Sequence, residues 1–407
     1  MAEQKGETEL PSRRGNPSLR RKICAISGSR AEFSLLRGVL KKISLSKKLK
    51  LQLIVTGSHL SRSHGHTIGE IKREGFIPDI RVPLPGIDTG EKQISEIMGA
   101  ALTGLGKAMV KLRPDMVLLL GDRYETFCAA AAATALRIPV AHIHGGEVTA
   151  GSFDDAFRHA ITKMSHLHFT ATKLARRRVI QMGEHPHTVF WVGAPGLDGI
   201  EARGRMTRSE LEKSLNLRFQ KKNLLVTYHP ATRERGKGVA QIRELCAALR
   251  HFPNALIVFT GVNQDPEGRN IQREIDCFVA ARPNARSVTS MGSERYLSFL
   301  RQADVVVGNS SSALLEAPSV GCWALNIGSR QNGRERTDNV IDVECRRRPI
   351  RNHLVLLLRR NKSRQKRRFS NPYARQGSVK KIVKILEQHH PSQWLKKSFF
   401  DGRIFDS

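Results

Sequence analysis

Residues 22–45 read KICAISGSRAEFSLLRGVLKKISL, and this stretch decides the fold class. Residues 23–26 form a short apolar run followed by Gly28, a pattern typical of a buried strand that ends in a turn. Apolar residues then recur at helical spacing over residues 31–45, and a second strand is expected at residues 49–56, before Gly57. The stretch therefore predicts a strand, a helix and a second strand in direct succession.

The same alternation continues along the chain. Strands are expected at residues 116–120 and 139–143, with a buried helix at residues 129–136 between them. After about residue 220 the pattern starts again, and strands are expected at residues 224–228, 255–260, 305–307 and 322–327. Alternating strands and helices are typical of doubly wound parallel sheets. The fold class expected is α/β, with two Rossmann-like domains whose parallel sheets face an interdomain cleft.

Four parts are expected along the chain. They are a disordered tail at residues 1–21, an N-terminal Rossmann-like domain at 22–200, a C-terminal Rossmann-like domain at 201–370, and a helix and tail at 371–407 that pack back on the N-terminal domain. The first twenty residues are polar and lack the apolar centre of a signal peptide. No stretch approaches the roughly 18 apolar residues that a membrane-spanning helix needs. We therefore expect a cytoplasmic protein without a membrane partner.

The charge of the chain is strongly positive. Lysine and arginine number 68 against 37 acidic residues, a formal net charge of +31. Residues 346–368 hold eleven basic residues and no acidic one, and residues 346–370 are expected to form an exposed basic segment. The rest of the chain keeps a large positive excess, aromatic residues are not interleaved with the basic runs, and no nucleic-acid-binding motif is present. A nucleic-acid-binding protein on an enzyme-like scaffold remains an alternative, which steep salt-dependent binding without turnover would reveal.

Titratable residues concentrate just after the predicted strands of the first half. Asp122 follows one strand, His144 and Glu147 follow the next, and Asp154 and Asp155 come shortly afterwards. The carboxyl ends of parallel strands are where such sheets bind ligands. Packing alone does not require acids and bases there, so the pattern predicts acid/base chemistry.

Structural explanations exist for each of these groups. Asp122 could cap a helix, Glu147 could pair with an arginine, and Asp155 could face solvent. Pairs four residues apart share a helix face, so Asp154 with Arg158, or Asp155 with His159, could also be a simple surface pair.

Two glycine turns are candidate phosphate sites. In the first half, Gly28-Ser29-Arg30 joins a strand to a helix and offers backbone N–H groups and a positive charge, but it is not a GxGxxG sequence, and taken alone an ordinary turn is the better explanation. In the second half, residues 308–312 read GNSSS at a helix start, which suits a diphosphate, or an ordinary N-cap. Glu316 lies one turn further on, where its carboxylate could bind ribose hydroxyls. Arg330 and Arg334 follow the next strand and could reach the same phosphates.

Taken together, these segments resemble one enzyme family. The chain is similar to the hydrolysing UDP-N-acetylglucosamine 2-epimerase of the bacterial sialic-acid pathway, and to the epimerase half of the bifunctional animal enzyme. The resemblance spans residues 22–387 and rests on GSRAEF, GDRYE, HIHGGE, DDAFRHAITKMSHLH, YHP, GNSSS, NIGSRQNGR and SNPY, in family order. It implies the glycosyltransferase-B architecture, with UDP held mainly by the C-terminal domain and the sugar in the interdomain cleft.

The resemblance also implies site residues. The positions that match nucleotide contacts are Arg30, Ser34, Arg123, His229, Asn263, Ser310, Ser311, Glu316 and Arg330, with Ser312 in the same serine-rich helix start. The positions that match the acid/base cluster around the sugar are Asp122, Glu147, Asp154 and Asp155. His144 joins them as a candidate, because the animal form has a carboxylate there and the bacterial form a histidine. His229 is also a candidate catalytic group, because it could stabilise the charge that develops on the departing diphosphate.

The reaction expected is hydrolysis of UDP-N-acetylglucosamine to N-acetylmannosamine and UDP. Inverting C2 needs a redox cofactor or an elimination, and the chain lacks a dinucleotide fingerprint, so elimination of UDP to a glycal is favoured. We expect no cofactor and no metal, and a homo-oligomer, either a dimer or a tetramer. Two substrate or product alternatives stay open: a hydrolysing epimerase for UDP-N,N'-diacetylbacillosamine, and a non-hydrolysing UDP-N-acetylglucosamine 2-epimerase.

Overall fold

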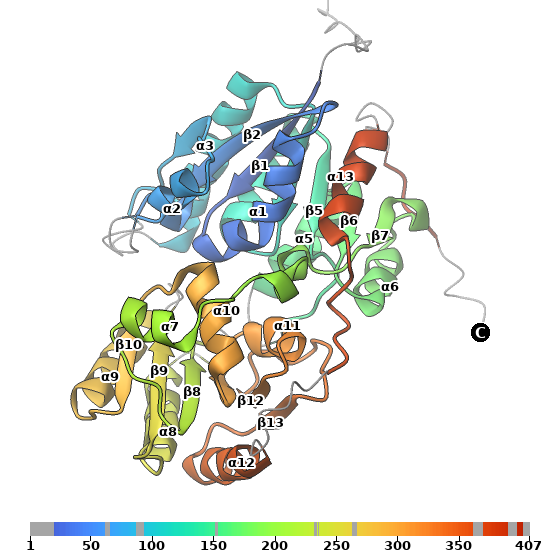
Figure 1. Cartoon of the computed structure of the whole chain (residues 1–407). Helices are drawn as coiled ribbons and strands as arrows, with labels where there is room; N and C mark the ends of the chain where they lie inside the picture. Colours follow the sequence, from blue (N-terminus) through green and yellow to red (C-terminus); the bar gives the residue numbers. More distant parts are fainter. Residues whose placement is uncertain are drawn as a thin grey trace, which may run out of the picture.

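The computed structural model describes residues 20–61, 66–86, 93–150, 154–231, 234, 236–262, 267–360, 369–389 and 397–401. It contains two α/β units, each built on one parallel sheet and placed one above the other in Figure 1. The tail expected at residues 1–21 lies outside the described residues up to residue 19. Among the described residues, no helix has both the length and the apolar character needed to cross a membrane.

The first sheet has seven strands in the order β3-β2-β1-β4-β5-β6-β7, and every neighbouring pair is parallel. Its strands are β1 (Arg21–Ser27), β2 (Leu49–Thr56), β3 (Ile80–Val82), β4 (Met116–Leu120), β5 (Val140–Ile143), β6 (Leu167–Thr170) and β7 (Val189–Trp191). Its helices are α1 (Arg30–Ser44), α2 (Ile68–Arg73), α3 (Ile94–Leu112), α4 (Tyr124–Ala135), α5 (Asp154–Met164) and α6 (Lys173–Gln181). The expected strand, helix and strand of residues 22–56 are confirmed as β1, α1 and β2.

The second sheet has six parallel strands in the order β10-β9-β8-β11-β12-β13. These are β8 (Lys222–Thr227), β9 (Ala255–Thr260), β10 (Ala285–Val288), β11 (Val305–Gly308), β12 (Trp323–Ile327) and β13 (Val340–Val343). Its helices are α7 (Arg208–Leu215), α8 (Gly238–Leu249), α9 (Gly268–Ala280), α10 (Gly292–Gln302), α11 (Ser312–Ser319) and α12 (Arg347–Arg360). The strand order repeats that of the first sheet, which confirms the α/β fold with two Rossmann-like units.

The basic segment expected to be exposed is only partly so. Residues 347–360 form α12, and its Ile350, Leu354 and Leu357 are fully buried in the core of the second unit. These residues recur at helical spacing, so one face packs while the arginines lie on the other. The apolar positions therefore decide how this segment folds, in spite of its five arginines.

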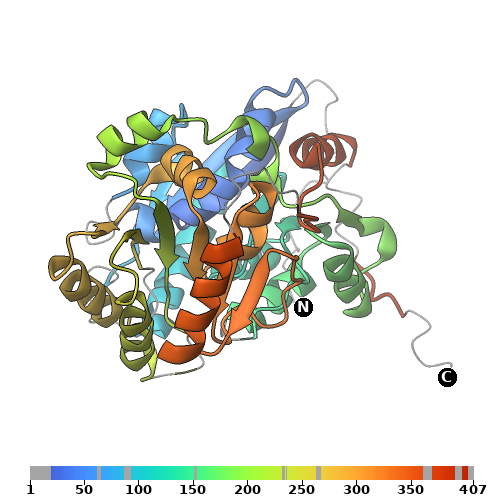
Figure 2. The same ribbon diagram turned by 60° about the horizontal axis from the view of Figure 1, so that its bottom comes forward.

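The chain crosses between the units twice, and the two crossings are bonded to each other. The last helix, α13 (Ser378–Gln388), lies beside α1 in Figure 1 and apart from the helices of the second unit in Figure 2. Its Ile382, Val383 and Leu386 are buried in the core of the first unit. The backbone N–H of Ala194 donates to the carbonyl of Tyr373 at 2.8 Å. The first unit is therefore completed by a helix that follows the second unit in the sequence.

Loops at the carboxyl ends of the two sheets meet. The N–H of Ala150, after β5, donates to the carbonyl of Asn332, after β12, at 2.9 Å. Arg334 Nη2 lies 3.5 Å from Glu147 Oε2 across the same junction. The ligand-binding edges of both sheets therefore face each other.

Candidate active site

One buried arginine joins the acid/base residues of the first unit. Arg158, on α5, has a side chain only 2% exposed. Its Nη2 donates to Asp122 Oδ2, and to Thr149 Oγ1 at 3.1 Å. Its Nη1 donates to the carbonyl of His144 at 3.3 Å and lies 3.7 Å from Glu147 Oε2. The turns after β4 and β5, which the sequence predicted to carry the chemistry, are thus brought together by α5.

His144 and Glu147 form a buried pair. His144 Nδ1 lies 2.5 Å from Glu147 Oε1, and the two side chains are 7% and 4% exposed. His144 Nε2 is buried and has no hydrogen-bond partner among the residues that the structure describes. A carboxylate that accepts the Nδ1 proton selects the tautomer in which Nε2 is unprotonated. The pair therefore presents an imidazole nitrogen that is able to accept a proton.

The turn that carries this pair has a constrained backbone. His144 has φ +67°, in the left-handed region that non-glycine residues seldom adopt. Gly146 has φ +75°, and a Cβ there would lie 2.3 Å from the carbonyl oxygen of Ala175. Only glycine fits at that position, so the HIHGGE sequence fixes the path of the turn.

Glu147 is held in its ionised form. Burial alone would raise the pKa of Glu147, but His144, Arg334 and Arg158 together hold it well below its ordinary value. The expected structural alternative, a pairing with arginine, is therefore present, and it coexists with the bond to His144. An ionised Glu147 is suited to orient an imidazole and unsuited to donate a proton.

Asp154 and Asp155 begin α5 at the edge of this cluster. Asp155 Oδ1 accepts the N–H of Thr149 at 2.7 Å, and its Oδ2 lies 3.7 Å from His159 Nε2. Although burial would raise the pKa of Asp155, the nearby His159 imidazole and the hydrogen bond from that N–H hold it below its ordinary value. The expected i,i+4 pair of Asp155 and His159 is present, whereas Arg158 turns to Asp122. Asp122 does not cap α4, since Arg123 occupies the N-cap position.

In the second unit, the turns after β8 and β11 are locked together. Asn309 Oδ1 accepts the N–H of His229 at 2.8 Å, and Asn309 Nδ2 donates to the carbonyl of His229 at 2.7 Å. A Cβ on Gly308 would lie 1.9 Å from the carbonyl oxygen of Thr227, so glycine is required there. These two strands are adjacent where the strand order reverses, which is the position at which such sheets bind nucleotides.

The predicted nucleotide residues of the second unit gather around this turn. Arg330 Nη1 donates to the carbonyl of Asn309 at 3.3 Å. Ser311 is the N-cap residue of α11, but its side chain makes no capping hydrogen bond, whereas Ser310 Oγ accepts the N–H of Ser312 at 3.3 Å. Burial, followed by the charge of Arg330, lowers the pKa of His229 to about 3. His229 is therefore a neutral hydrogen-bonding group at neutral pH and not a phosphate-binding cation.

Glu316 is bound to its own helix. Ser312 hydrogen-bonds the Glu316 carboxylate and also accepts a bond from Tyr296 Oη at 2.5 Å. Burial raises the pKa of Glu316, and the Ser312 hydrogen bond and the nearby Arg203 and Arg334 oppose this rise. The Ser312 hydroxyl thus supports Glu316 from within the fold.

The turn before α1 is an ordinary helix start, which was the favoured explanation of this segment taken alone. The N–H groups of Gly28 and Ser29 were candidate phosphate donors. Both donate instead to Glu32 Oε2, at 2.7 and 3.0 Å. Ser29 and Glu32 form a capping box, so these two donors are already satisfied. The spacing of Ser29 and Glu32 was a readable signal for this bond. Arg30 and Ser34 lie half-buried on the first turns of α1.

The last two predicted nucleotide residues have different outcomes. Arg123 Nε lies 3.2 Å from Glu125 Oε2, at the start of α4. Asn263 lies outside the described residues.

Two arginines have roles in this site that the sequence did not predict. Arg158 occupies an inward position of α5, as do Ile161 and Thr162, and this i, i+3, i+4 spacing was a signal for a buried charge. Arg334 was expected at the phosphates, but it lies 3.5 Å from Glu147 because that carboxylate approaches from the other unit.

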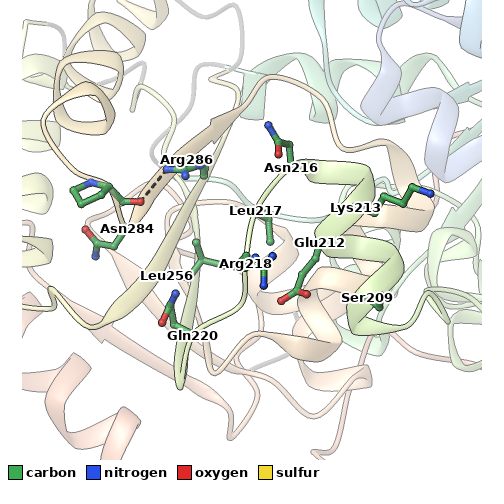
Figure 3. Close-up of a pocket in the computed structure, with 11 residues that line it drawn as sticks. Ser209, Glu212, Lys213, Asn216, Leu217, Arg218, Gln220, Leu256, Asn284 and Arg286 are labelled. Carbon is green, nitrogen blue, oxygen red and sulfur yellow. Dashed lines mark hydrogen bonds between the residues drawn. The ribbon is translucent and has the colours of Figure 1, made fainter.

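A cavity elsewhere in the second unit is unrelated to these residues. It has a volume of about 570 Å³ and lies beside the amino ends of β8, β9 and β10, opposite the edge that carries His229 and Asn309 (Figure 3). Basic and amide side chains surround it, among them Lys213, Arg218 and Asn284. We place the candidate site at the carboxyl edge, because the acid/base groups and the GNSSS turn lie there.

Comparison with known proteins identifies the family. The model of the UDP-N-acetylglucosamine 2-epimerase family matches residues 41–387. The chain belongs to this epimerase family. It is 37% identical over 326 residues to the GDP/UDP-N,N'-diacetylbacillosamine 2-epimerase (hydrolyzing) of Campylobacter jejuni, covering 80% of this chain and 85% of that one. It is 36% identical to the UDP-N,N'-diacetylbacillosamine 2-epimerase (hydrolyzing) of Legionella pneumophila, covering 90% and 96%.

A solved epimerase structure has the same fold. The UDP-GlcNAc 2-epimerase of Neisseria meningitidis, bound to UDP-GlcNAc, superposes with a TM-score of 0.78 over 90% of this epimerase-family chain and all of its own. The sequence identity is 18%, so the likeness concerns the fold. The expected glycosyltransferase-B architecture of this family member is confirmed.

Proposed function

We propose that this chain is a hydrolysing 2-epimerase, which releases UDP from a UDP-activated 2-acetamido sugar and inverts the sugar at C2. The observation that carries the proposal is the His144–Glu147 pair, with Nδ1 bound to the carboxylate and Nε2 buried without a partner among the described residues. Such a pair supplies the base that proton abstraction at C2 requires. The hydrolysing relatives support the release of UDP.

The chemistry proceeds in two halves. His144 Nε2 takes the C2 proton while the C1–O bond breaks, which leaves a glycal and UDP. Arg330 and the GNSSS helix start stabilise the negative charge on the departing diphosphate, and His229 assists as a neutral donor. Asp122, whose side chain is 23% exposed, then passes a proton from solvent to C2 on the opposite face, and water adds to the cationic C1 and releases a proton to solvent.

Two UDP-sugars are candidate substrates. The motifs resemble enzymes that act on UDP-N-acetylglucosamine, whereas the two relatives at 36% and 37% identity are hydrolysing enzymes for UDP-N,N'-diacetylbacillosamine. We favour the diacetylated sugar, because these two relatives are 36% and 37% identical to the chain over most of their own length. UDP-N-acetylglucosamine, which would give N-acetylmannosamine for sialic-acid synthesis, is the second candidate.

Incubation with each substrate in heavy water is expected to release free UDP without added NAD and to place deuterium at C2 of the product. The expectation follows from proton abstraction by a group that exchanges with solvent before the proton returns. NMR identifies the sugar, the nucleotide and the isotope in one experiment. The ratio of kcat/KM for the two UDP-sugars decides between the substrates. A product that keeps its original C2 hydrogen would exclude the elimination, and a product still joined to UDP would favour the non-hydrolysing alternative.

We also propose that the second unit holds UDP. Glu316→Ala and Arg330→Ala are each expected to weaken UDP binding by about 10- to 100-fold, the cost of losing a hydrogen bond to a charged group. Isothermal titration calorimetry measures the affinity, and thermal melting checks the fold. Lys213→Ala, at an exposed position of α7 in the same unit, is the control and should bind UDP normally. Unchanged UDP affinity in both site variants would contradict the assignment of the nucleotide to the second unit.

A further inference from the structure

We infer that Arg158 is a positioning residue, which holds Asp122, Glu147 and the turn of His144 together as one charge-balanced acid/base unit. This inference rests on the proposed function, because it assigns a role within the same site. Arg158 itself has no part in the proton transfers. It acts through the groups that it contacts.

The contacts of Arg158 reach every segment that carries the chemistry. The guanidinium binds the Asp122 carboxylate after β4, and the carbonyl of His144 and the hydroxyl of Thr149 after β5. It also lies 3.7 Å from Glu147 Oε2. A chain of 36 residues separates Arg158 from Asp122, so this one side chain fixes a distance that no local hydrogen bond controls.

The charges around Arg158 explain why a cation is needed there. Acidic groups face it from the β4 turn (Asp122), the β5 turn (Glu147) and the start of α5 (Asp154 and Asp155). The other cationic or titratable groups around the cluster are His142, His144, His159 and, from the second unit, Arg334. Several carboxylates close together repel one another. Removal of the cation would therefore raise their pKa values and favour their protonated forms. Although burial opposes the charge of Arg158, these acids keep its pKa above the ordinary value.

Arginine also has the geometry that this position requires. Its two terminal nitrogens point to different turns, with Nη1 toward His144 and Glu147 and Nη2 toward Asp122 and Thr149. Lysine has a single nitrogen on a flexible stem and cannot hold both turns in the same way. Charge and fork geometry are therefore separable by substitution.

Two variants separate the effect of the charge of Arg158 from the effect of its fork geometry. Arg158→Gln removes the charge and is expected to lower kcat by about 10- to 100-fold. It is also expected to raise the pH of the acid limb of kcat/KM, because carboxylates without the cation protonate at higher pH and activity is lost earlier as pH falls. Arg158→Lys restores the charge, so the acid limb should return toward the wild-type position while kcat recovers only in part. UDP affinity, measured by calorimetry, should stay within about twofold in both.

The matched control is Arg178→Gln. Arg178, on α6, donates to the carbonyl of Gly146 at 3.4 Å, in the turn that also carries His144. Among the described residues, its side chain contacts none of the acidic groups that face Arg158. It should leave the pH profile in place. If Arg158→Gln fails a melting test, the kcat and pH profile of Arg158→Lys decide alone.

The outcomes separate this inference from the proposed function. Wild-type protein that releases no UDP from either sugar refutes the proposed function. Wild-type turnover combined with an unchanged acid limb in a folded Arg158→Gln overturns the positioning role, even where kcat falls. A shift of the limb in Arg178→Gln as large as in Arg158→Gln also overturns it, because the effect would then come from loosening the turn.

Discussion

Asp122→Asn is expected to lower kcat for UDP release by roughly 10²–10⁴-fold, the usual contribution of a positioned acid/base group. Asparagine keeps the shape of the side chain but can neither take up nor relay a proton. It also withdraws one of the anions that balance the buried Arg158. Asp122 is assigned to the sugar, so UDP should still bind.

The measurement is steady-state UDP release, with calorimetry for UDP affinity and melting for stability. Asp79→Asn is the matched control, since Asp79 accepts the N–H of Leu53 at 2.7 Å on the same sheet but lies at the amino end of β3. Normal turnover by a folded Asp122→Asn would show that Asp122 serves only as the counter-ion of Arg158.

His144→Asn is expected to abolish turnover to a similar extent, by roughly 10²–10⁴-fold, because it removes the nitrogen that takes the C2 proton. Asparagine is chosen since it tolerates the left-handed φ of +67° better than alanine does. Exchange of deuterium into C2 of the sugar, followed by NMR, should disappear together with UDP release. Loss of a base affects proton exchange directly, whereas a binding defect would be overcome at high substrate concentration.

Glu147→Gln provides the companion measurement. It removes the carboxylate that orients His144 Nδ1, so kcat should fall while UDP affinity stays unchanged. Near-normal kcat in both His144→Asn and Glu147→Gln would contradict the assigned base. His142 is a poor substitute, because its Nε2 lies 2.7 Å from the carbonyl of Gly121 and burial lowers its pKa to about 3.

The fold could be predicted where the apolar pattern was unambiguous. The run at residues 23–26 and the helical spacing that follows correspond to β1 and α1, because local pattern and burial agree there. The three-residue strands β3 and β7 carry too few residues for a period to be read. In α12 the exposed arginines obscured the buried Ile350 and Leu354, although the helical spacing of the apolar residues was present.

The site could be predicted as a location but not as a set of contacts. Parallel strands place their carboxyl ends at one edge, so Asp122 and His144 were expected near each other. The direction of the Arg158 side chain depends on which turn lies above α5, and that is a property of tertiary packing. The binding of Glu32 to the Gly28 and Ser29 N–H groups follows from a local capping box, which the sequence did contain.

The dependence of the first unit on α13 has a consequence for how the protein is made. During translation α13, the helix that covers α1, leaves the ribosome only after the whole of the second unit, since all of that unit lies between the two helices in the sequence. At about 5–20 residues per second, the apolar surface of α1 waits on the order of tens of seconds for its partner. The second unit, with its own core, is synthesised completely in that interval. The N-terminal half therefore matures last, and its nascent form is the species on which chaperones and proteases have the longest time to act.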